Sequence, residues 1–276
     1  MKSDTLRVPG ATLYHEIRGA GPLLLFLPGG GGDAGTVDPL AEVLEKHFTV
    51  VSLDPRGYSR SVLDGPQVTQ RVEVQSADAH RLITHLTGDP VFVVGGSAGA
   101  IVGLDLLARH PDRVRHLVAH EPPCFAVLPD AAAHRAMIDE VVTLFHAEGL
   151  AAASARFLAG IGNAMKPAPV AAELPPRAAE MWTRLAANGP LMIEHELREF
   201  TSYLPDYEAL TAHRDRLTLA VGRETAPALP CRPAAEIAAR LGLRATEFPG
   251  AHNGMRTDAA EFADQLVAAL VGSAAF

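Results

Sequence analysis

Short apolar runs alternate with amphipathic segments along most of the chain. Seven of these runs predict strands, because a few consecutive or alternating apolar residues are bounded by turn-forming residues. Several runs are apolar throughout, as expected for strands that helices cover on both faces. The predicted strands are Ala11–Arg18, Leu23–Leu27, Phe48–Leu53, Val91–Gly95, Val114–His120, Leu217–Val221 and Ala245–Phe248.

Helical patterns fill the spaces between these strands. In the last of them, apolar residues recur on one face at the spacing of an α-helix. The alternation of strands and helices predicts an α/β fold in which helices flank a mostly parallel, twisted sheet. The predicted helices are Val37–Lys46, Val72–Leu86, Ala98–Arg109, Pro233–Leu241 and Asp258–Val271.

The alternation stops between about residues 125 and 210, where helical patterns occur without a convincing strand. Proline-rich stretches punctuate this segment. A helical insertion between the sixth and seventh strands predicts a lid over the carboxyl edge of the sheet, where open α/β sheets bind ligands. We therefore expect a core of residues 1–124 and 211–276 and a cap of residues 125–210. The helices expected in the cap are Ala131–His146, Leu150–Leu158, Ala178–Ala187 and Leu191–Tyr203.

Composition and charge exclude several classes of protein. The 276 residues, of which 48% are hydrophobic, fit one large α/β domain with an insertion. A net charge of -8 argues against a nucleic-acid partner, because binding phosphates requires a basic surface. Neither Cys124 nor Cys231 belongs to a CxxC pair, and no cluster has metal-ligand spacing, so we expect no disulfide framework, metal or other cofactor. Without a signal-peptide pattern or a membrane-spanning apolar run, we expect a cytoplasmic monomer or homodimer that does not bind membranes.

The candidate chemistry centres on the stretch Gly95-Gly96-Ser97-Ala98-Gly99. This G-x-S-x-G motif joins a strand pattern to a helix pattern, which is the context of a nucleophile elbow. The turn has to be tight enough to lift Ser97 Oγ into a cleft, so a side chain at position 95 or 99 would clash with the backbone. The helix that follows points its N-terminus at the serine, which favours a developing negative charge.

Three further segments occur in the order typical of one superfamily. Leu24–Gly30 leads from a strand into a glycine loop, and Asp54–Ser61 matches D-x-R-G-x-G-x-S with Ser59 where glycine is usual. Phe248–His252 ends in a histidine after the last predicted strand. With the elbow, these segments make the chain resemble an α/β-hydrolase over nearly its full length. Within the turn Asp54–Ser61, we expect the charged residues to hold the turn rather than touch a substrate.

The resemblance implies Ser97 as the nucleophile and His252 as the general base. The chain order in this fold is serine, then acid, then histidine. Of the twelve histidines, His252 alone lies directly after the last predicted strand. A histidine there would take the proton of Ser97 Oγ and pass it to the leaving group.

The acid departs from the usual pattern. The usual acid ends a G-x-x-D turn after the strand Leu217–Val221, but Thr225 holds that position here. Glu224 lies one residue early and is an alternative. Glu121, at the end of the strand that follows the nucleophile helix, is the acid that we favour. The resemblance supports this choice, because zearalenone-type lactone hydrolases and some dehalogenases place their acid there.

Two backbone N–H groups are needed to hold the oxyanion of the tetrahedral intermediate. The resemblance takes one from the residue after the serine, here Ala98, and the other from the loop Gly29–Gly32. Matching Pro28-Gly29 to the usual His-Gly makes Gly30 the second donor, with Gly31 as the alternative.

The pattern as a whole predicts a serine hydrolase that cleaves a carboxylic ester or lactone of a moderately apolar small molecule. Acyl transfer to an alcohol or amine and cofactor-free perhydrolysis need the same residues and stay open as alternatives. A non-catalytic ligand-binding protein on this scaffold is a third alternative. Five residues of the predicted cap could line a substrate pocket, although core packing explains them as well: Phe157, Trp182, Met192, Phe200 and Tyr203.

Overall fold

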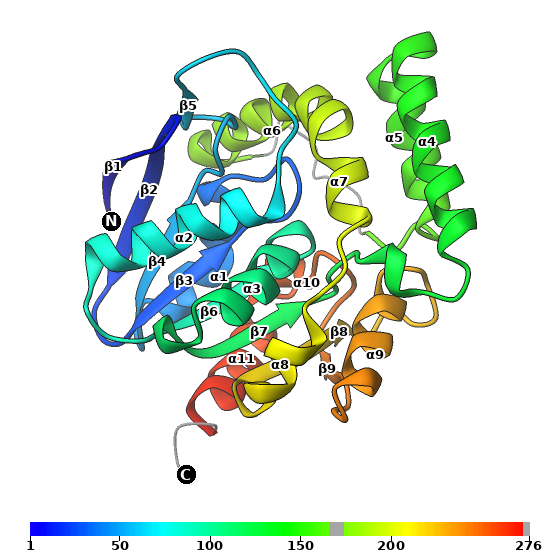
Figure 1. Ribbon diagram of the computed structural model, residues 1–276. Coiled ribbons are helices and arrows are strands. Elements are labelled where there is room, and N and C mark those ends of the chain that lie inside the picture. The colour runs from blue at the N-terminus through cyan, green and yellow to red at the C-terminus, as the bar shows by residue number, and fades with distance from the viewer. Residues whose placement is uncertain (166–173, 273–276) are drawn as a thin grey trace.

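A nine-stranded sheet runs through the centre of the computed structural model, which describes residues 1–165 and 174–272 (Figure 1). The strand order is β1-β2-β4-β3-β6-β7-β8-β9, and β5 pairs with β2. All pairs from β4 to β9 are parallel, whereas β1, β2 and β5 join the sheet in antiparallel orientation. The strands are β1 (Lys2–Val8), β2 (Ala11–Gly19), β3 (Leu23–Leu27), β4 (Thr49–Leu53), β5 (Val62–Leu63), β6 (Val91–Gly96), β7 (Val114–His120), β8 (Leu217–Gly222) and β9 (Thr246–Phe248).

Helices cover both faces of the sheet, which explains why the central strands are apolar along their whole length. In Figure 1, α2, α3 and α8 lie on one face of the sheet and α1 and α11 on the other. The α-helices are α1 (Asp38–Leu44), α2 (Val72–Leu86), α3 (Ala98–Arg109), α4 (Ala131–Glu148), α5 (Leu150–Gly160), α6 (Pro176–His195), α7 (Leu197–Thr201), α8 (Tyr207–Ala212), α9 (Cys231–Arg240), α10 (Gly254–Thr257) and α11 (Ala259–Gly272). Short 3₁₀ helices include η1 (Ala34–Val37), η2 (Pro111–Arg113), η3 (Phe125–Val127) and η5 (Arg214–Arg216).

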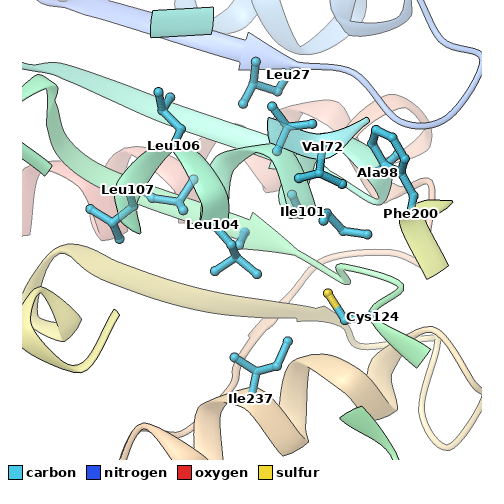
Figure 2. Packing of buried hydrophobic residues seen from close by; sticks show 14 of the residues in the cluster. Leu27, Val72, Ala98, Ile101, Leu104, Leu106, Leu107, Cys124, Phe200 and Ile237 are labelled. Carbon is cyan, nitrogen blue, oxygen red and sulfur yellow. The ribbon is translucent and has the colours of Figure 1, made fainter. Parts of the chain in front are cut away.

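Helix α3 is the centre of the larger hydrophobic cluster. Its side chains Ile101, Leu104 and Leu107 are fully buried. Figure 2 shows them in one cluster with Phe200 of α7 and with Cys124, which follows β7. Each fully buried leucine or isoleucine stabilises the fold by roughly 1.5–3 kcal/mol. The cluster therefore fixes α3, and with it the turn that precedes the helix.

The expected strands and most of the expected helices are present, with ends that differ by one or two residues. Strands β1 and β5 were not predicted. Strand β1 is an edge strand whose residues are mostly exposed, so its sequence lacks an apolar pattern. Strand β5 has only two residues. The short helices α8 and α10 were also missed, because each spans less than two turns.

The segment between β7 and β8 contains helices and no strand among its described residues. We call residues 125–210 the helical insertion. Helices α4 and α5 form an antiparallel pair at one side of Figure 1, and α6 and α7 lie across the end of the sheet. The predicted break between Ala187 and Leu191 is wrong, because α6 continues through Pro190 to His195. The predicted helix Leu191–Tyr203 is divided instead: its first residues belong to α6, and the separate helix α7 follows.

The contacts of α6 explain why Gly189 and Pro190 do not end it. Asn188 lies in the middle of α6, is 2% exposed and is bonded to the core, so tertiary contacts outweigh the local preference for a turn. One of the proline-rich stretches that punctuate this segment, Lys166–Pro169, lies outside the described residues. Among the described helices, none is long and apolar enough to cross a membrane.

Candidate active site

Ser97 lies on a sharp turn between β6 and α3. Its backbone has φ 53° and ψ -120°, a conformation that residues with a side chain rarely adopt. The backbone N–H of Ser97 donates to the carbonyl of His120 at the end of the neighbouring strand β7 (2.9 Å). A Cβ on Gly99 would lie 2.1 Å from the Leu27 carbonyl oxygen, and one on Gly95 would lie 2.4 Å from the Gly99 carbonyl oxygen. The two glycines of the motif are therefore required by the backbone packing, as the sequence predicts.

Glu121 and His252 meet at the same edge of the sheet. His252 Nδ1 lies 2.6 Å from Glu121 Oε2, and the Gly222 N–H donates to Glu121 Oε1 at 2.8 Å. Glu121 is completely buried, while the His252 side chain is 11% exposed. The backbone N–H of His252 donates to the carbonyl of Ala164 in the helical insertion (3.2 Å). Strands β7 and β8 and the insertion together hold this pair.

The environment of Glu121 favours its charged form. Burial raises the pKa of Glu121, but the hydrogen bond and the charge of His252, with the Gly222 N–H, lower it more, so the net shift is downward. The neighbouring His120 is buried as well, and burial lowers its pKa to about 4. His120 is therefore neutral at physiological pH, and Glu121 is the anion that faces the His252 ring.

The alternative acid, Glu224, lies in the turn that follows β8. Glu224 is exposed, and its backbone N–H donates to the Gly250 carbonyl at 3.0 Å. Thr225, at the position where the superfamily usually has its acid, is 2% exposed. Because Glu121 already contacts His252 Nδ1, the geometry favours Glu121 over Glu224 as its partner.

Ser97 belongs to the same edge as this pair. Gly96 and His120 are register partners on β6 and β7, so Ser97 and Glu121 are the first residues beyond two aligned strand ends. Neighbouring strands lie about 4.8 Å apart. Within the described residues, the Ser97 hydroxyl makes no hydrogen bond, so proton transfer from Ser97 to His252 stays a prediction. Catalytic hydrogen bonds are often long in the absence of substrate.

The glycine loop lies beside the elbow. The Gly32 N–H donates to the Gly29 carbonyl (2.9 Å), which closes a turn with Gly30 and Gly31 at its tip. A Cβ on Gly29 would lie 3.4 Å from Ser97 Cβ, and one on Gly30 would lie 3.8 Å from Ala98 Cβ. Ala98 begins α3, and the first N–H groups of a helix have no acceptor within it. The structure thus brings the predicted donor residues together next to Ser97.

The five candidate pocket residues of the insertion lie in different surroundings. Met192 of α6 contacts the tip of the glycine loop, with its Cγ 3.3 Å from where a Gly30 Cβ would be. The Trp182 ring stacks against the Arg256 guanidinium of α10 at 4.7 Å, close in sequence to His252. Phe157 packs against the larger hydrophobic cluster, and Phe200 is buried within it.

Tyr203 has a structural partner. Its hydroxyl donates to Asp105 Oδ1 of α3 at 3.0 Å, and burial raises its pKa. Of the five residues, Met192 and Trp182 therefore have contacts that place them nearest to the elbow, the glycine loop and the His252 turn.

The turn Asp54–Ser61 is held by its own charges, as the sequence predicts. Asp54 accepts hydrogen bonds from the Arg60 side chain and from the Ala34 N–H at 2.8 Å. Arg56 makes two hydrogen bonds to the buried Asp78. These contacts fix the turn against η1 and α2.

Sequence reasoning missed two residues of α6, Arg184 and Asn188, and the residue just after its end, Glu196, which lie against the glycine loop or the residues around it. Asn188 and Glu196 are almost completely buried, and Arg184 makes an ion pair with Asp33 at 2.6 Å. Burial raises the pKa of Glu196 to about 7, although nearby Tyr58 and Gln75 lower it in part. The available signal was the recurrence of polar residues on one helix face at positions 177, 184 and 188.

The comparisons with known proteins agree with this architecture. A family model described as alpha/beta hydrolase fold matches residues 22–162, about half of the chain. The chain is 34% identical over 272 residues to the uncharacterized hydrolase YraK of Bacillus subtilis (strain 168), which covers 96% of this chain and 95% of that protein. It is also 31% identical over 129 residues to the zearalenone hydrolase of Bionectria ochroleuca, which covers 44% of this chain and 47% of that protein.

Among solved structures, the enol-lactonase from Burkholderia xenovorans LB400 has a TM-score of 0.69 at 19% identity. The match covers 98% of this chain and all of that chain (100%). At this identity, the likeness shows the fold alone. Together, the family model, the full-length relative and the fold show that the chain belongs to the α/β-hydrolase fold family and is a hydrolase.

Proposed function

We propose that this hydrolase cleaves a carboxylic ester or lactone of a moderately apolar small molecule through an acyl-enzyme on Ser97. The observation that carries the proposal is the 2.6 Å contact between His252 Nδ1 and the buried carboxylate of Glu121. A carboxylate on Nδ1 fixes the histidine tautomer that leaves Nε2 free to accept a proton, and it stabilises the imidazolium that results. The enol-lactonase with the same fold supports including lactones.

Acylation begins when Ser97 Oγ attacks the carbonyl carbon and its proton passes to His252 Nε2. The carbonyl oxygen becomes an oxyanion, and the N–H groups of Ala98 and Gly30 donate to it. Loss of one such donor lowers the rate about 10²–10³-fold in other serine hydrolases. The carbon–oxygen bond to the alcohol then breaks, and the alkoxide leaves with the proton from His252. In a lactone, the alcohol stays attached to the acyl group.

Deacylation repeats these steps with water. The water oxygen attacks the acyl carbon while His252 accepts one water proton, and the second tetrahedral intermediate uses the same two donors. When this intermediate collapses, Ser97 Oγ leaves and takes the proton back, and the carboxylic acid is released. An alcohol, an amine or hydrogen peroxide in place of water would give acyl transfer or perhydrolysis.

Labelling with a fluorophosphonate tests the nucleophile directly. Wild type and Ser97→Ala are incubated with the probe, and peptide mass spectrometry locates the adduct. We expect the adduct on Ser97 in wild type and none in the variant, with turnover of short p-nitrophenyl esters or of simple lactones lost in parallel. A folded wild type that neither carries the adduct nor turns over any of these substrates would refute the proposal and would favour a ligand-binding protein.

A further inference from the structure

One face of α6 lies directly on the predicted oxyanion loop. Asn188, Met192 and Glu196 follow one another at intervals of four residues, so they share this face or continue it just beyond the end of the helix. A Cβ on Gly30 would lie 2.7 Å from Glu196 Oε1, and one on Gly31 would lie 3.4 Å from Met192 Cβ. A Cβ on Gly30 would displace the Glu196 carboxylate, whereas at Gly31 the φ of 66° favours glycine.

Asn188 is bonded to the loop and to the turn after β4 at the same time. Its Nδ2 donates to the Gly31 carbonyl at 2.9 Å and to Ser59 Oγ at 2.9 Å. Its Oδ1 accepts the Ser59 N–H at 3.0 Å. The side chain is 2% exposed, so these three bonds form in a site that excludes most water.

The contact with Gly31 fixes one peptide group of the loop from both sides. The peptide between Gly31 and Gly32 donates its N–H to Gly29 and accepts from Asn188 through its carbonyl. A loop of four glycines has many accessible conformations, and Gly31 itself has φ 66°. An oxyanion donor is effective only when it is held in place before the reaction. The Gly29 carbonyl that accepts the Gly32 N–H belongs to the same peptide group as the Gly30 N–H, so fixing the Gly31–Gly32 peptide also limits the directions in which the Gly30 N–H can point.

We propose that Asn188 is a positioning residue that aligns the oxyanion loop, so that docking of α6 assembles one half of the oxyanion hole. This inference rests on the proposed function, because it assumes that the Gly30 N–H, or that of Gly31, receives the oxyanion. It also explains Ser59. A serine at this position supplies a second acceptor for Asn188, whereas the usual glycine would supply only its backbone N–H.

Asn188→Asp is the sharpest variant, because the carboxylate keeps the shape and still accepts from Ser59. It loses the N–H that holds the Gly31 carbonyl. Arg177→Ala is the matched control, since Arg177 also ties α6 to the core, through Glu16 (2.5 Å) and Asp38 (2.6 Å), without contacting the loop. Both variants are compared with wild type in hydrolysis of p-nitrophenyl acetate, in binding of phenylboronic acid and in thermal unfolding.

We expect kcat of Asn188→Asp to fall about 10- to 100-fold while KM changes less than threefold, as for partial loss of one oxyanion donor. The affinity for phenylboronic acid, whose tetrahedral adduct places an oxygen in the oxyanion hole, should fall in parallel. Arg177→Ala should keep kcat within threefold. A folded Asn188→Asp with kcat and boronate affinity within twofold of wild type would overturn the inference.

Hydrogen exchange separates failure of this inference from failure of the proposed function. If wild type carries no fluorophosphonate adduct and turns over neither esters nor lactones, the proposed function fails. Exchange of a peptide that covers residues 29–36 then still tests the positioning role. We expect faster exchange of this peptide in Asn188→Asp and unchanged exchange in Arg177→Ala. Equal exchange in wild type and Asn188→Asp would show that the loop does not depend on this contact.

Discussion

Ser97 and Glu121 both have an unusual positive φ angle just beyond the ends of two neighbouring parallel strands. Their φ angles are 53° and 47°, and the residues before them, Gly96 and His120, are register partners. A positive φ angle at a residue with a side chain costs of order 1–3 kcal/mol. Such residues persist where the surrounding structure holds them, often at functional sites. The pair therefore marks the carboxyl ends of β6 and β7 as a place where the backbone is strained.

This strain predicts a stability difference between two variants of Ser97. Glycine tolerates the conformation and alanine does not. The free energy of unfolding of Ser97→Gly should therefore be about 1 kcal/mol higher than that of Ser97→Ala. Both variants lack the hydroxyl, which makes them a matched pair. Urea unfolding at neutral pH measures the difference. Equal stabilities, or a more stable Ser97→Ala, would mean that the turn relaxes at no cost.

The elbow glycines predict a second difference. In Gly99→Ala, the new Cβ would lie 2.1 Å from the Leu27 carbonyl oxygen, in a backbone contact that cannot move without shifting β3. We expect a loss of at least about 4 kcal/mol or no soluble protein. Gly88→Ala is the control, because nothing lies within 4 Å of its Cβ position. Yield and thermal unfolding of the two variants are compared, and a stable Gly99→Ala would disprove the predicted clash.

Glu196 predicts a dependence of stability on pH. Burial raises its pKa from the ordinary 4.5 to about 7, with Tyr58 and Gln75 lowering it in part. Between these values, the native state holds a proton that the unfolded chain has released. Protonated Glu196 therefore stabilises the native state fully below pH 4.5. This stabilisation, about 3 kcal/mol in all, is lost as the pH rises through about 7.

Glu196→Gln cannot titrate and tests this directly. We expect the free energy of unfolding of the variant, relative to wild type, to increase by about 3 kcal/mol between pH 4 and pH 8. Glu199→Gln, a substitution at an exposed site, should show no such trend. If wild type and Glu196→Gln have parallel pH profiles, Glu196 does not titrate in this range.

Thr225 predicts that the acid can be relocated. It holds the position of the usual acid, and its Oγ1 lies 2.7 Å from where a Gly222 Cβ would be. That position is also 2.9 Å from the backbone of Ala251, the residue before His252. In a Glu121→Gln background, Thr225→Asp should recover at least tenfold of the lost kcat/KM if its carboxylate reaches Nδ1. Thr225→Asn in the same background is the uncharged control. No recovery, or equal recovery with asparagine, would show that this position cannot supply the acid.

The sequence predicted the parts of the fold that depend on continuous apolar burial. Strands such as β3, β6 and β7 are buried on both faces, so their apolar runs were visible without any knowledge of their partners. Strand β1 was not visible, because its residues are mostly exposed at the edge of the sheet. The elbow was predictable because it depends on a local turn, in which a side chain at either motif glycine would clash with the backbone.

The remaining parts depend on contacts between distant segments. The sequence offered Glu121 and Glu224 as acids, and only the approach of the His252 turn to β7 favours Glu121. The local pattern placed Asn188 in a helix break. Its three hydrogen bonds, which favour the continuous helix, join it to residues more than a hundred positions away. Local patterns contain no information about such partners.

The most direct test of the proposed site compares Glu121→Gln with Glu224→Gln. Both substitutions remove one negative charge and keep the shape of the side chain. We expect kcat/KM for p-nitrophenyl acetate to fall about 10³–10⁴-fold in Glu121→Gln, as when a triad acid loses its charge, and to stay within threefold of wild type in Glu224→Gln. The opposite result, with Glu224→Gln inactive and Glu121→Gln active, would contradict the account.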